Sequence, residues 1–224
     1  MAGARLVNAN ATYDVLRDFS PVSQLEIAPF VLVVHPSVPA KTLKEYVALA
    51  RSRPGNMTFA TLGGQMPYWN AMLFNSMAKI KATEIPYKSL GDAIVDVMAG
   101  RVDYYIAPSA QYVAGKDKLR PLGVTSPKRS PAFPEIPSIA EGGVTGYDLP
   151  AWRSIMGPAG VRRDIVDALN GAIRKTLALP EIRDKMLAVG SEPMPSSPEE
   201  LSKRYAEWIT IFTKVAKDAG LKPQ

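Results

Sequence analysis

The sequence predicts an α/β fold built around a doubly wound parallel sheet. From residue 29 to residue 125, short apolar segments alternate with segments of helical periodicity, the order that is typical of successive strand–helix–strand units. The run PFVLVVHP is continuously apolar between two prolines, as expected for a strand that is buried on both faces. The 224 residues suffice for one large domain or two small ones.

The N-terminal elements follow from local patterns. Residues 1–25 contain few periodic apolar positions and are expected to be irregular. A helix is predicted in SVPAKTLKEYVALARSRPG, because its apolar residues recur at helical spacing and Pro54–Gly55 ends the pattern. Thr42 is the expected N-cap of this helix, with Glu45 as its capping-box partner.

The middle of the chain continues the alternation. Strands are predicted in MTFAT, ATEIPYKS, RVDYYIA and LRPLGVTS, and helices in YWNAMLFNSMAKI and DAIVDVMA. A polar segment is expected between the last two of these strands. The proline- and glycine-rich segment 127–150 is too long for a simple turn, and we expect an ordered crossover between two lobes.

The C-terminal part is predicted to be mainly helical. SIMGPAG is expected to form one more strand, followed by helices over residues 163–179, 180–189 and 198–219. The last helix carries an apolar stripe, which predicts core packing rather than a cofactor site. The residues of this stripe are Leu201, Tyr205, Trp208, Ile209, Phe212 and Val215.

Composition excludes several classes of function. The net charge is +6, but the basic residues are scattered and lack interleaved aromatic residues, so we expect no nucleic-acid partner. No window has the ~18 consecutive apolar residues of a membrane span, and MAGARLVNAN has no apolar core of a signal peptide. With no cysteine and one histidine, we expect no metal and no cofactor.

Motifs of catalysis are largely missing. The sequence contains no Gly-x-Ser-x-Gly elbow, no phosphate-binding Gly-x-x-x-x-Gly-Lys-Ser/Thr and no His-Glu-x-x-His. The single histidine, His35, follows the apolar run of the first strand. It is either a structural residue at a strand end or the base of a serine hydrolase, and the sequence leaves both open.

A glycine turn offers a binding site instead. In FATLGGQMPYW, Gly63 and Gly64 stand between a strand and a helix that begins near Pro67. Proline fits the first helical turn, because its missing N–H would have no partner there. The N–H groups of Gly64, Gln65 and Met66 could converge on a carboxylate with help from the helix dipole. The same turn could equally be structural.

Several blocks of the chain, taken in order, resemble one family. They are LRDFSPVSQL, VLVVHPSVPAKTLKEYVALARSRPG, FATLGG, IPYKSLGDAIVDVMAGRVDYYI, LRPLGVTSPKRSPAFPEIPSIAEGG, WRSIMGPAG, and the tail from IVDALN to AGLKP. From about residue 12 to the C-terminus the chain is similar to the periplasmic substrate-binding proteins of tripartite tricarboxylate transporters, the Bug or TctC-like family.

The resemblance implies a periplasmic binding protein fold of type II, with two lobes of parallel or mixed sheets flanked by helices. Lobe 2, the α/β ligand-binding lobe, would comprise residues 56–125, and lobe 1 would comprise residues 1–55 and 126–224. Family members carry about a hundred further residues at the N-terminus, so lobe 1 is expected to be incomplete. Its exposed surfaces would favour a homodimer.

The resemblance also implies a site. Ligand contacts would come from the glycine turn, from the ends of the next two strands and from the crossover between the lobes. The implied ligand-binding residues are Thr61, Leu62, Gly63, Gly64, Gln65, Met66, Tyr68, Tyr87, Lys88, Ser89, Ala107, Pro108, Ser109 and Trp152. Lys88 is read equally as a counter-charge or as a surface residue, and Trp152 as a cleft wall or as a core residue. No catalytic residue is implied.

One departure from the family bears on this site. The family loop usually reads Gly-x-Gly-x-x-Ser-His, whereas this chain has Gln65-Met66-Pro67-Tyr68 after the glycines. Tyr68 stands where the family often has histidine, which predicts a bulkier and more aromatic pocket.

The implied function is capture of a small carboxylate, an organic acid or amino acid, for transport. Partners would be the ligand and the membrane subunits of a tripartite transporter, and the location would be the periplasm. The alternative is a hydrolase that uses a serine with His35 in an opened cleft.

Overall fold

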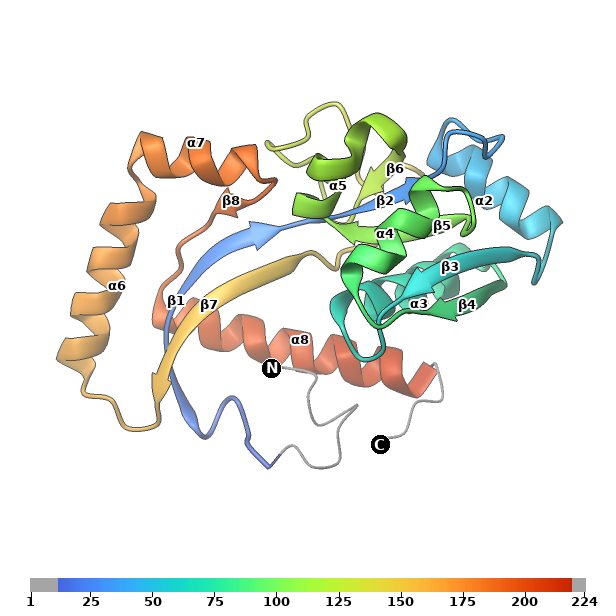
Figure 1. Cartoon of the computed structure of the whole chain (residues 1–224). Coiled ribbons are helices and arrows are strands. Elements are labelled where there is room, and N and C mark those ends of the chain that lie inside the picture. Colours follow the sequence, from blue (N-terminus) through green and yellow to red (C-terminus); the bar gives the residue numbers. More distant parts are fainter. Residues whose placement is uncertain (1–11, 219–224) are drawn as a thin grey trace. The chain divides into compact units, whose positions relative to one another are not determined.

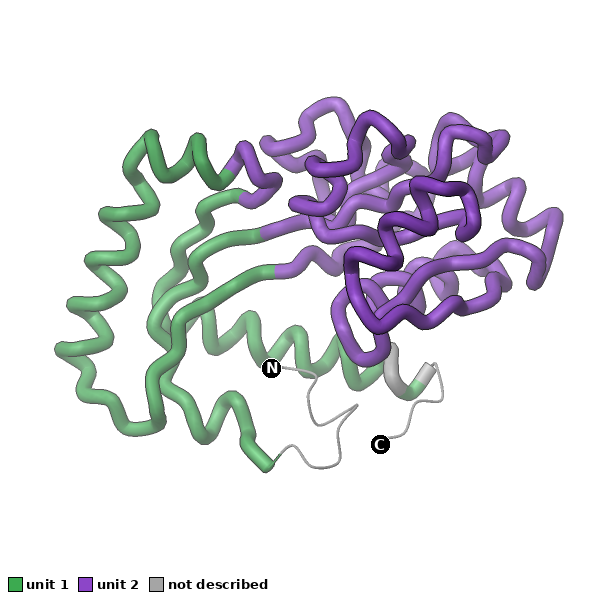
Figure 2. Tube along the Cα trace, viewed as in Figure 1, with its two compact units in different colours: residues 1–27, 152–186, 192–224 green, residues 28–151, 187–191 purple. Residues whose placement is uncertain are grey.

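The computed structural model describes residues 12–218, apart from the side chains of residues 215, 216 and 218 (Figure 1). The chain divides into two compact units (Figure 2). Unit 1 comprises residues 1–27, 152–186 and 192–224, and unit 2 comprises residues 28–151 and 187–191. Within the described range, no helix is long and apolar enough to cross a bilayer.

Unit 2 is built on a five-stranded sheet with the order β4-β3-β5-β2-β6. β3 runs parallel to both β4 and β5, whereas β2 runs antiparallel to both β5 and β6. The strands are β2 (Phe30–Val34), β3 (Met57–Thr61), β4 (Ala82–Pro86), β5 (Tyr104–Pro108) and β6 (Arg120–Val124).

The sheet is therefore mixed, as the parallel or mixed sheets of the expected fold class allow. The doubly wound parallel sheet that the alternation alone predicted was wrong at β2. Four of its five residues have no exposed surface and the fifth is 6% exposed, so the expectation of burial was right. A continuous apolar run reports that both faces of a strand are covered, and it carries no information on strand direction.

Four helices and a short 3-10 turn surround this sheet. They are α2 (Leu43–Ser52), α3 (Met66–Ala78), α4 (Leu90–Met98), α5 (Ser109–Gly115) and η1 (Lys116–Lys118). Thr42 caps α2 as predicted, with its Oγ1 accepting from the Glu45 N–H at 3.2 Å. The Glu45 carboxylate accepts in turn from the Lys41 N–H at 2.6 Å, one residue before the position expected for a capping box.

One helix was missed. The segment after β5 was expected only to be polar, with no helix assigned. It forms α5, whose Tyr112 packs edge-on against Phe133 at a centroid distance of 5.5 Å. Burial of that ring stabilises a helix of seven residues that would be marginal alone.

The two faces of the sheet are covered by different helices. On one face, Tyr104 of β5 contacts Tyr46 of α2 and Phe74 of α3 at centroid distances of 5.6 and 5.8 Å. On the other, Tyr105 and Ala107 pack with Ile94 of α4 in a second cluster. Strand alternation thus builds two cores, as a doubly covered sheet requires.

The predicted segment 127–150 is ordered and belongs to unit 2, and its role as a crossover between lobes stays a prediction. Ile139, Tyr147 and Leu149 have no exposed surface. Val124 forms a parallel bridge with Ser138, so the middle of this segment lies beside the end of β6.

Unit 1 contains a three-stranded sheet of order β7-β1-β8. Its strands are β1 (Phe19–Ala28), β7 (Ala151–Pro158) and β8 (Glu192–Pro193), and its helices are α6 (Arg163–Leu177), α7 (Pro180–Ala188) and α8 (Pro198–Asp218). Ala28 and Ala151, the end of β1 and the start of β7, fall within unit 2, as do Leu187 and Ala188 at the end of α7.

The prediction that residues 1–25 are irregular was wrong from Phe19 onward, where β1 begins. Ser23 and Gln24 are buried although they are polar. The Ser23 Oγ donates to the backbone at 2.7 Å, and the Gln24 side chain accepts from Arg204. These satisfied polar residues interrupt the apolar alternation by which a strand is recognised.

The stripe of α8 packs in a core as predicted. Leu201 and Tyr205 form a buried cluster with Val15, and Trp152 stacks edge-on against Tyr205 and Trp208 at 4.7 and 4.9 Å. The side chain of Val215, the last residue of the predicted stripe, lies outside the described residues.

The compact units have limits that differ from the predicted lobes. The expected boundaries at residues 55/56 and 125/126 both fall inside unit 2. The reason is that β2 and α2, which were assigned to lobe 1, supply the fourth strand and a covering helix of the unit 2 sheet. The division into functional lobes stays a prediction.

Candidate functional site

Three strand ends meet at one edge of the unit 2 sheet. Because β4, β3 and β5 are adjacent and parallel, their carboxyl ends lie at the same edge. The loops after them lead directly into α4, α3 and α5 (Figure 1). This arrangement brings together the residues that were predicted around positions 61–68, 87–89 and 107–109, at the edge where ligands of open α/β sheets bind.

The glycine turn after β3 has a defined geometry. The Gln65 N–H donates to the Leu62 carbonyl at 3.0 Å and closes the turn. Gly64 has a φ of 68°, a left-handed conformation that favours glycine. The Trp69 indole N–H donates to the Gly64 carbonyl at 3.2 Å and holds the turn against α3.

The turn leaves a different set of donors from the one that was expected. Gln65 uses its N–H within the turn, so this group cannot bind a ligand. The N–H groups of Gly64, Met66 and Tyr68 have no partner in the described part of the chain. Gln65 is the N-cap of α3 and Pro67 lies in the first turn, so Met66 and Tyr68 supply the helix N–H groups that point outward.

The residues at the end of β3, just before the two glycines, are buried. Thr61 has no exposed surface and Leu62 is 2% exposed, whereas Gly63, Gly64 and Gln65 are exposed. The Thr61 hydroxyl donates to Oε1 of Glu84 on β4 at 2.5 Å. Thr61 therefore orients the carboxylate of Glu84. Sequence reasoning did not identify Glu84 as a residue of the site.

The end of β4 is tied into the fold. The Tyr87 N–H donates to the Thr61 carbonyl at 2.9 Å, and its hydroxyl donates to Oδ2 of Asp96 at 2.7 Å. Burial, followed by the bond to Asp96, raises the pKa of Tyr87 to about 12. Both polar groups of Tyr87 thus have protein partners, and its ring packs in the core beside α4.

Lys88 and Ser89 complete this loop. Lys88 is exposed and makes no ion pair with any carboxylate in the described ranges. The Ser89 Oγ caps α4, accepting from the Asp92 N–H at 3.1 Å and donating to Oδ2 of Asp92 at 2.7 Å. Asp92 places a negative charge at this helix start, so α4 is less suited to bind an anion than α3.

The end of β5 is covered rather than open. Ala107 has no exposed surface and Ser109 is 5% exposed. A Cβ placed on Gly190 would lie 2.7 Å from Cβ of Ser109, so the backbone of the returning segment 187–191 packs closely against α5. Of the three residues predicted here, only Pro108 is partly exposed.

Trp152 lies in unit 1, on β7. Its ring belongs to the cluster around Tyr205 and Met156, as expected for a core residue. Its buried indole nitrogen has no hydrogen-bond partner in the part of the chain that the structure describes.

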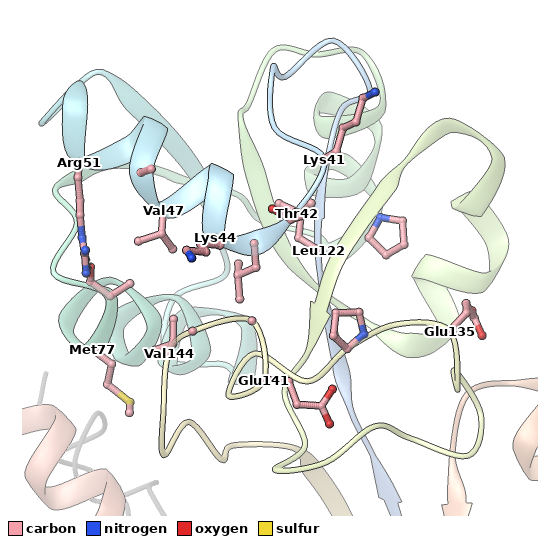
Figure 3. Close-up of a pocket in the computed structure, with 17 residues that line it drawn as sticks. Lys41, Thr42, Lys44, Val47, Arg51, Met77, Leu122, Glu135, Glu141 and Val144 are labelled. Carbon is pink, nitrogen blue, oxygen red and sulfur yellow. Dashed lines mark hydrogen bonds between the residues drawn. The ribbon is translucent and has the colours of Figure 1, made fainter.

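Unit 2 also contains a cavity of about 920 Å³, which none of the predicted ligand-binding residues lines (Figure 3). It lies between α2, the end of α3 and the loop around residues 135–144. Arg51 faces it, but its guanidinium donates to the Ala78 carbonyl at 2.7 and 3.0 Å. Glu141 is likewise paired with Arg129 at 3.0 Å. We favour the strand edge as the site because its N–H donors have no such partners.

His35 has a structural setting. Its Nδ1 lies 2.7 Å from the Ser37 Oγ and accepts from the Ser37 N–H at 3.2 Å, so both contacts are made within one turn. The ring packs over Gly100, whose φ is 70°. Among the side chains that the structure describes, no carboxylate is hydrogen-bonded to this ring, and no group of three or more His, Asp or Glu could hold a metal.

The comparisons with known proteins point to one family. Residues 3–221 match the family described as "Tripartite tricarboxylate transporter family receptor". A UPF0065 protein from the tcbD-tcbE intergenic region of Pseudomonas sp. strain P51 is 33% identical over 86% of this chain and 59% of its own length. The chain thus spans less than two thirds of that relative.

Two similar proteins have been solved with an acid bound. The R. palustris protein Rpa4515 with adipate is 31% identical, with a TM-score of 0.85 over 98% of this chain and 75% of that one. MatC (Rpa3494) from Rhodopseudomonas palustris with bound malate is 27% identical, with a TM-score of 0.79 over 96% of this chain and 75% of that one.

Proposed function

Because the chain belongs to the tripartite tricarboxylate transporter receptor family, we propose that it captures a small carboxylate at the edge formed by the ends of β3, β4 and β5. The observation that carries this proposal is the first turn of α3. There the N–H groups of Gly64, Met66 and Tyr68 have no protein partner among the described residues. The adipate and malate bound to two similar proteins support the ligand class.

The chemistry of the site suits binding without reaction. Backbone N–H groups at a helix start bind a carboxylate through hydrogen bonds and the helix dipole. The first turn of α3 contains no acidic residue that would compete for these donors. The comparisons give no support to a hydrolase, and the setting of His35 is that of a turn residue.

A thermal-shift screen of organic acids tests capture. Small carboxylates are expected to raise the melting temperature, since a ligand that binds only the folded state stabilises it. If no acid in the panel raises the melting temperature, the proposal is wrong.

Met66→Pro tests the location of the site. Met66 is the first residue of α3 and follows Gln65, whose backbone is extended (φ −93°, ψ 169°). Proline is tolerated at the first position of a helix. It also requires an extended residue before it, and Gln65 meets this condition. The substitution therefore removes one N–H and keeps the helix. We expect binding to weaken by about tenfold or more, the loss of one hydrogen bond to a charged group.

Met66→Ala is the matched control, because it removes the side chain and keeps the N–H. The two variants should melt at similar temperatures without ligand and differ in affinity. Equal affinity of both variants for the same acid would place the site elsewhere.

We further propose that the protein works in the periplasm with the membrane subunits of a tripartite transporter, as the family description implies. A protein similar in fold is described as the periplasmic binding protein BugD. Co-purification of the chain with such subunits in the presence of ligand would support this partnership, and its absence under the same conditions would count against it.

We also propose that unit 1 self-associates. α6 buries only Val166, while Ile165 and Leu169 on the same helix are 47% and 45% exposed. Apolar side chains gathered on one helix favour association. Sedimentation analysis should give twice the monomer mass, and a monomer at high concentration would refute the homodimer.

A further inference from the structure

A carboxylate stands beside the proposed binding edge. Glu84 lies on β4, and its Oε1 accepts from the Thr61 hydroxyl at 2.5 Å. Thr61 is the last residue of β3 and has no exposed surface. The Glu84 side chain is therefore held toward the strand end that leads into the glycine turn.

The charge of Glu84 also reaches the first turn of α3. Burial, and after it the charge of Glu84, raises the pKa of Tyr68, the third residue of that helix. Glu84 forms no ion pair with a Lys, Arg or His in the described ranges of the chain. It is exposed, so its second oxygen can accept from a bound molecule.

We propose that Glu84 sets the charge preference of the ligand. It favours carboxylates that carry an ammonium group over dicarboxylates of the same length. This inference rests on the proposed function, because it requires that one carboxylate is bound at the first turn of α3.

The physical argument is electrostatic. The ligand's first carboxylate is bound by the N–H groups of Gly64, Met66 and Tyr68. The far end of a short ligand can then approach the Glu84 carboxylate, which the Thr61 bond holds toward the same strand end. An ammonium group there is attracted to Glu84, and a second carboxylate is repelled.

The experiment compares β-alanine, succinate and propionate. Each carries a carboxylate on a two-carbon chain, and the far end of that chain bears an ammonium group, a second carboxylate or no charge. Affinities are measured by calorimetry for the wild type and for Glu84→Gln, which keeps an acceptor for the Thr61 hydroxyl. We expect the ratio of β-alanine affinity to succinate affinity to fall by about tenfold in Glu84→Gln. Propionate should change little.

Glu135→Gln is the matched control. Glu135 is an exposed carboxylate of the same unit, so the control removes one negative charge without touching the edge. Its affinity ratio should equal that of the wild type.

The outcomes separate the two proposals. Binding of these acids with the same ratio in wild type and Glu84→Gln overturns the role of Glu84 and leaves carboxylate capture intact. A ratio that falls equally in Glu84→Gln and Glu135→Gln also overturns it, because general charge would then be the cause. If neither wild type nor variant binds any of the acids, both proposals fail.

Discussion

At the scale of single residues, the glycine positions show how backbone conformation and neighbours act together. Gly100 follows the end of α4 with a φ of 70°, and a Cβ placed there would lie 3.3 Å from Nδ1 of His35. Gly91 is the second residue of α4, and its φ is not positive. A Cβ placed on it would lie 3.7 Å from the Ser89 Oγ, an ordinary van der Waals contact.

Alanine substitution at these two glycines should therefore have opposite effects. Gly100→Ala is expected to lower the free energy of unfolding by about 1–2 kcal/mol, through left-handed strain and crowding of His35. Gly91→Ala should raise it by about 0.4–1 kcal/mol, because alanine reduces the conformational freedom of the unfolded chain at a position that it can occupy without strain. Urea denaturation measures both, and two changes of the same sign would contradict this account of α4.

Some residues of the site could be predicted from the sequence, and others could not. The glycine turn was found because Gly63–Gly64 and Pro67 are local signals with a known conformational meaning. The role of Glu84 could not be found in this way, since it depends on the pairing of β4 with β3. The use of the Gln65 N–H inside the turn likewise needs the backbone conformation.

At the scale of elements, α2 shows a cap that the sequence predicted. The Thr42 Oγ1 accepts from the Glu45 N–H at 3.2 Å, and Thr42 has the extended backbone of an N-cap.

Thr42→Ala should lower the free energy of unfolding by about 1 kcal/mol, because one helix N–H loses its acceptor. Thr42→Ser, the control, keeps the hydroxyl and should retain most of the stability. Chemical denaturation of both variants checks this expectation, and equal losses would show that the methyl group, not the cap, matters.

The elements that were mispredicted share a cause. β2 was identified as a buried strand but with the wrong direction, and β1 was missed because Ser23 and Gln24 are buried through polar contacts. Periodicity reports which side chains are covered. It cannot report strand direction, nor a polar residue whose partners lie far along the chain.

At the scale of the whole molecule, buried tyrosines make the stability of unit 2 depend on pH. Tyr46, Tyr104 and Tyr147 have no exposed surface. Burial is the main cause that raises the pKa of each of these phenols well above its ordinary value near 10. The unfolded chain releases these protons near that pH, whereas the folded unit retains them.

The stability of unit 2 should therefore fall as the pH rises above about 10, and these groups should have no effect below it. An absorbance titration should show part of the nine tyrosines ionising only together with unfolding. The urea-unfolded chain is the control, in which all of them titrate in one step. The same single step in a chain that keeps its native circular dichroism would contradict the buried cluster.

The central claim is that the first turn of α3 binds a carboxylate, and amide NMR tests it most directly. The isotope-labelled full chain is titrated with adipate, the acid bound to the similar protein Rpa4515. The account predicts the largest shift changes at the N–H groups of Gly64, Met66 and Tyr68, with little change at Lys41 and Lys44 beside the α2 cavity. Changes concentrated at that cavity, or none anywhere, would contradict it.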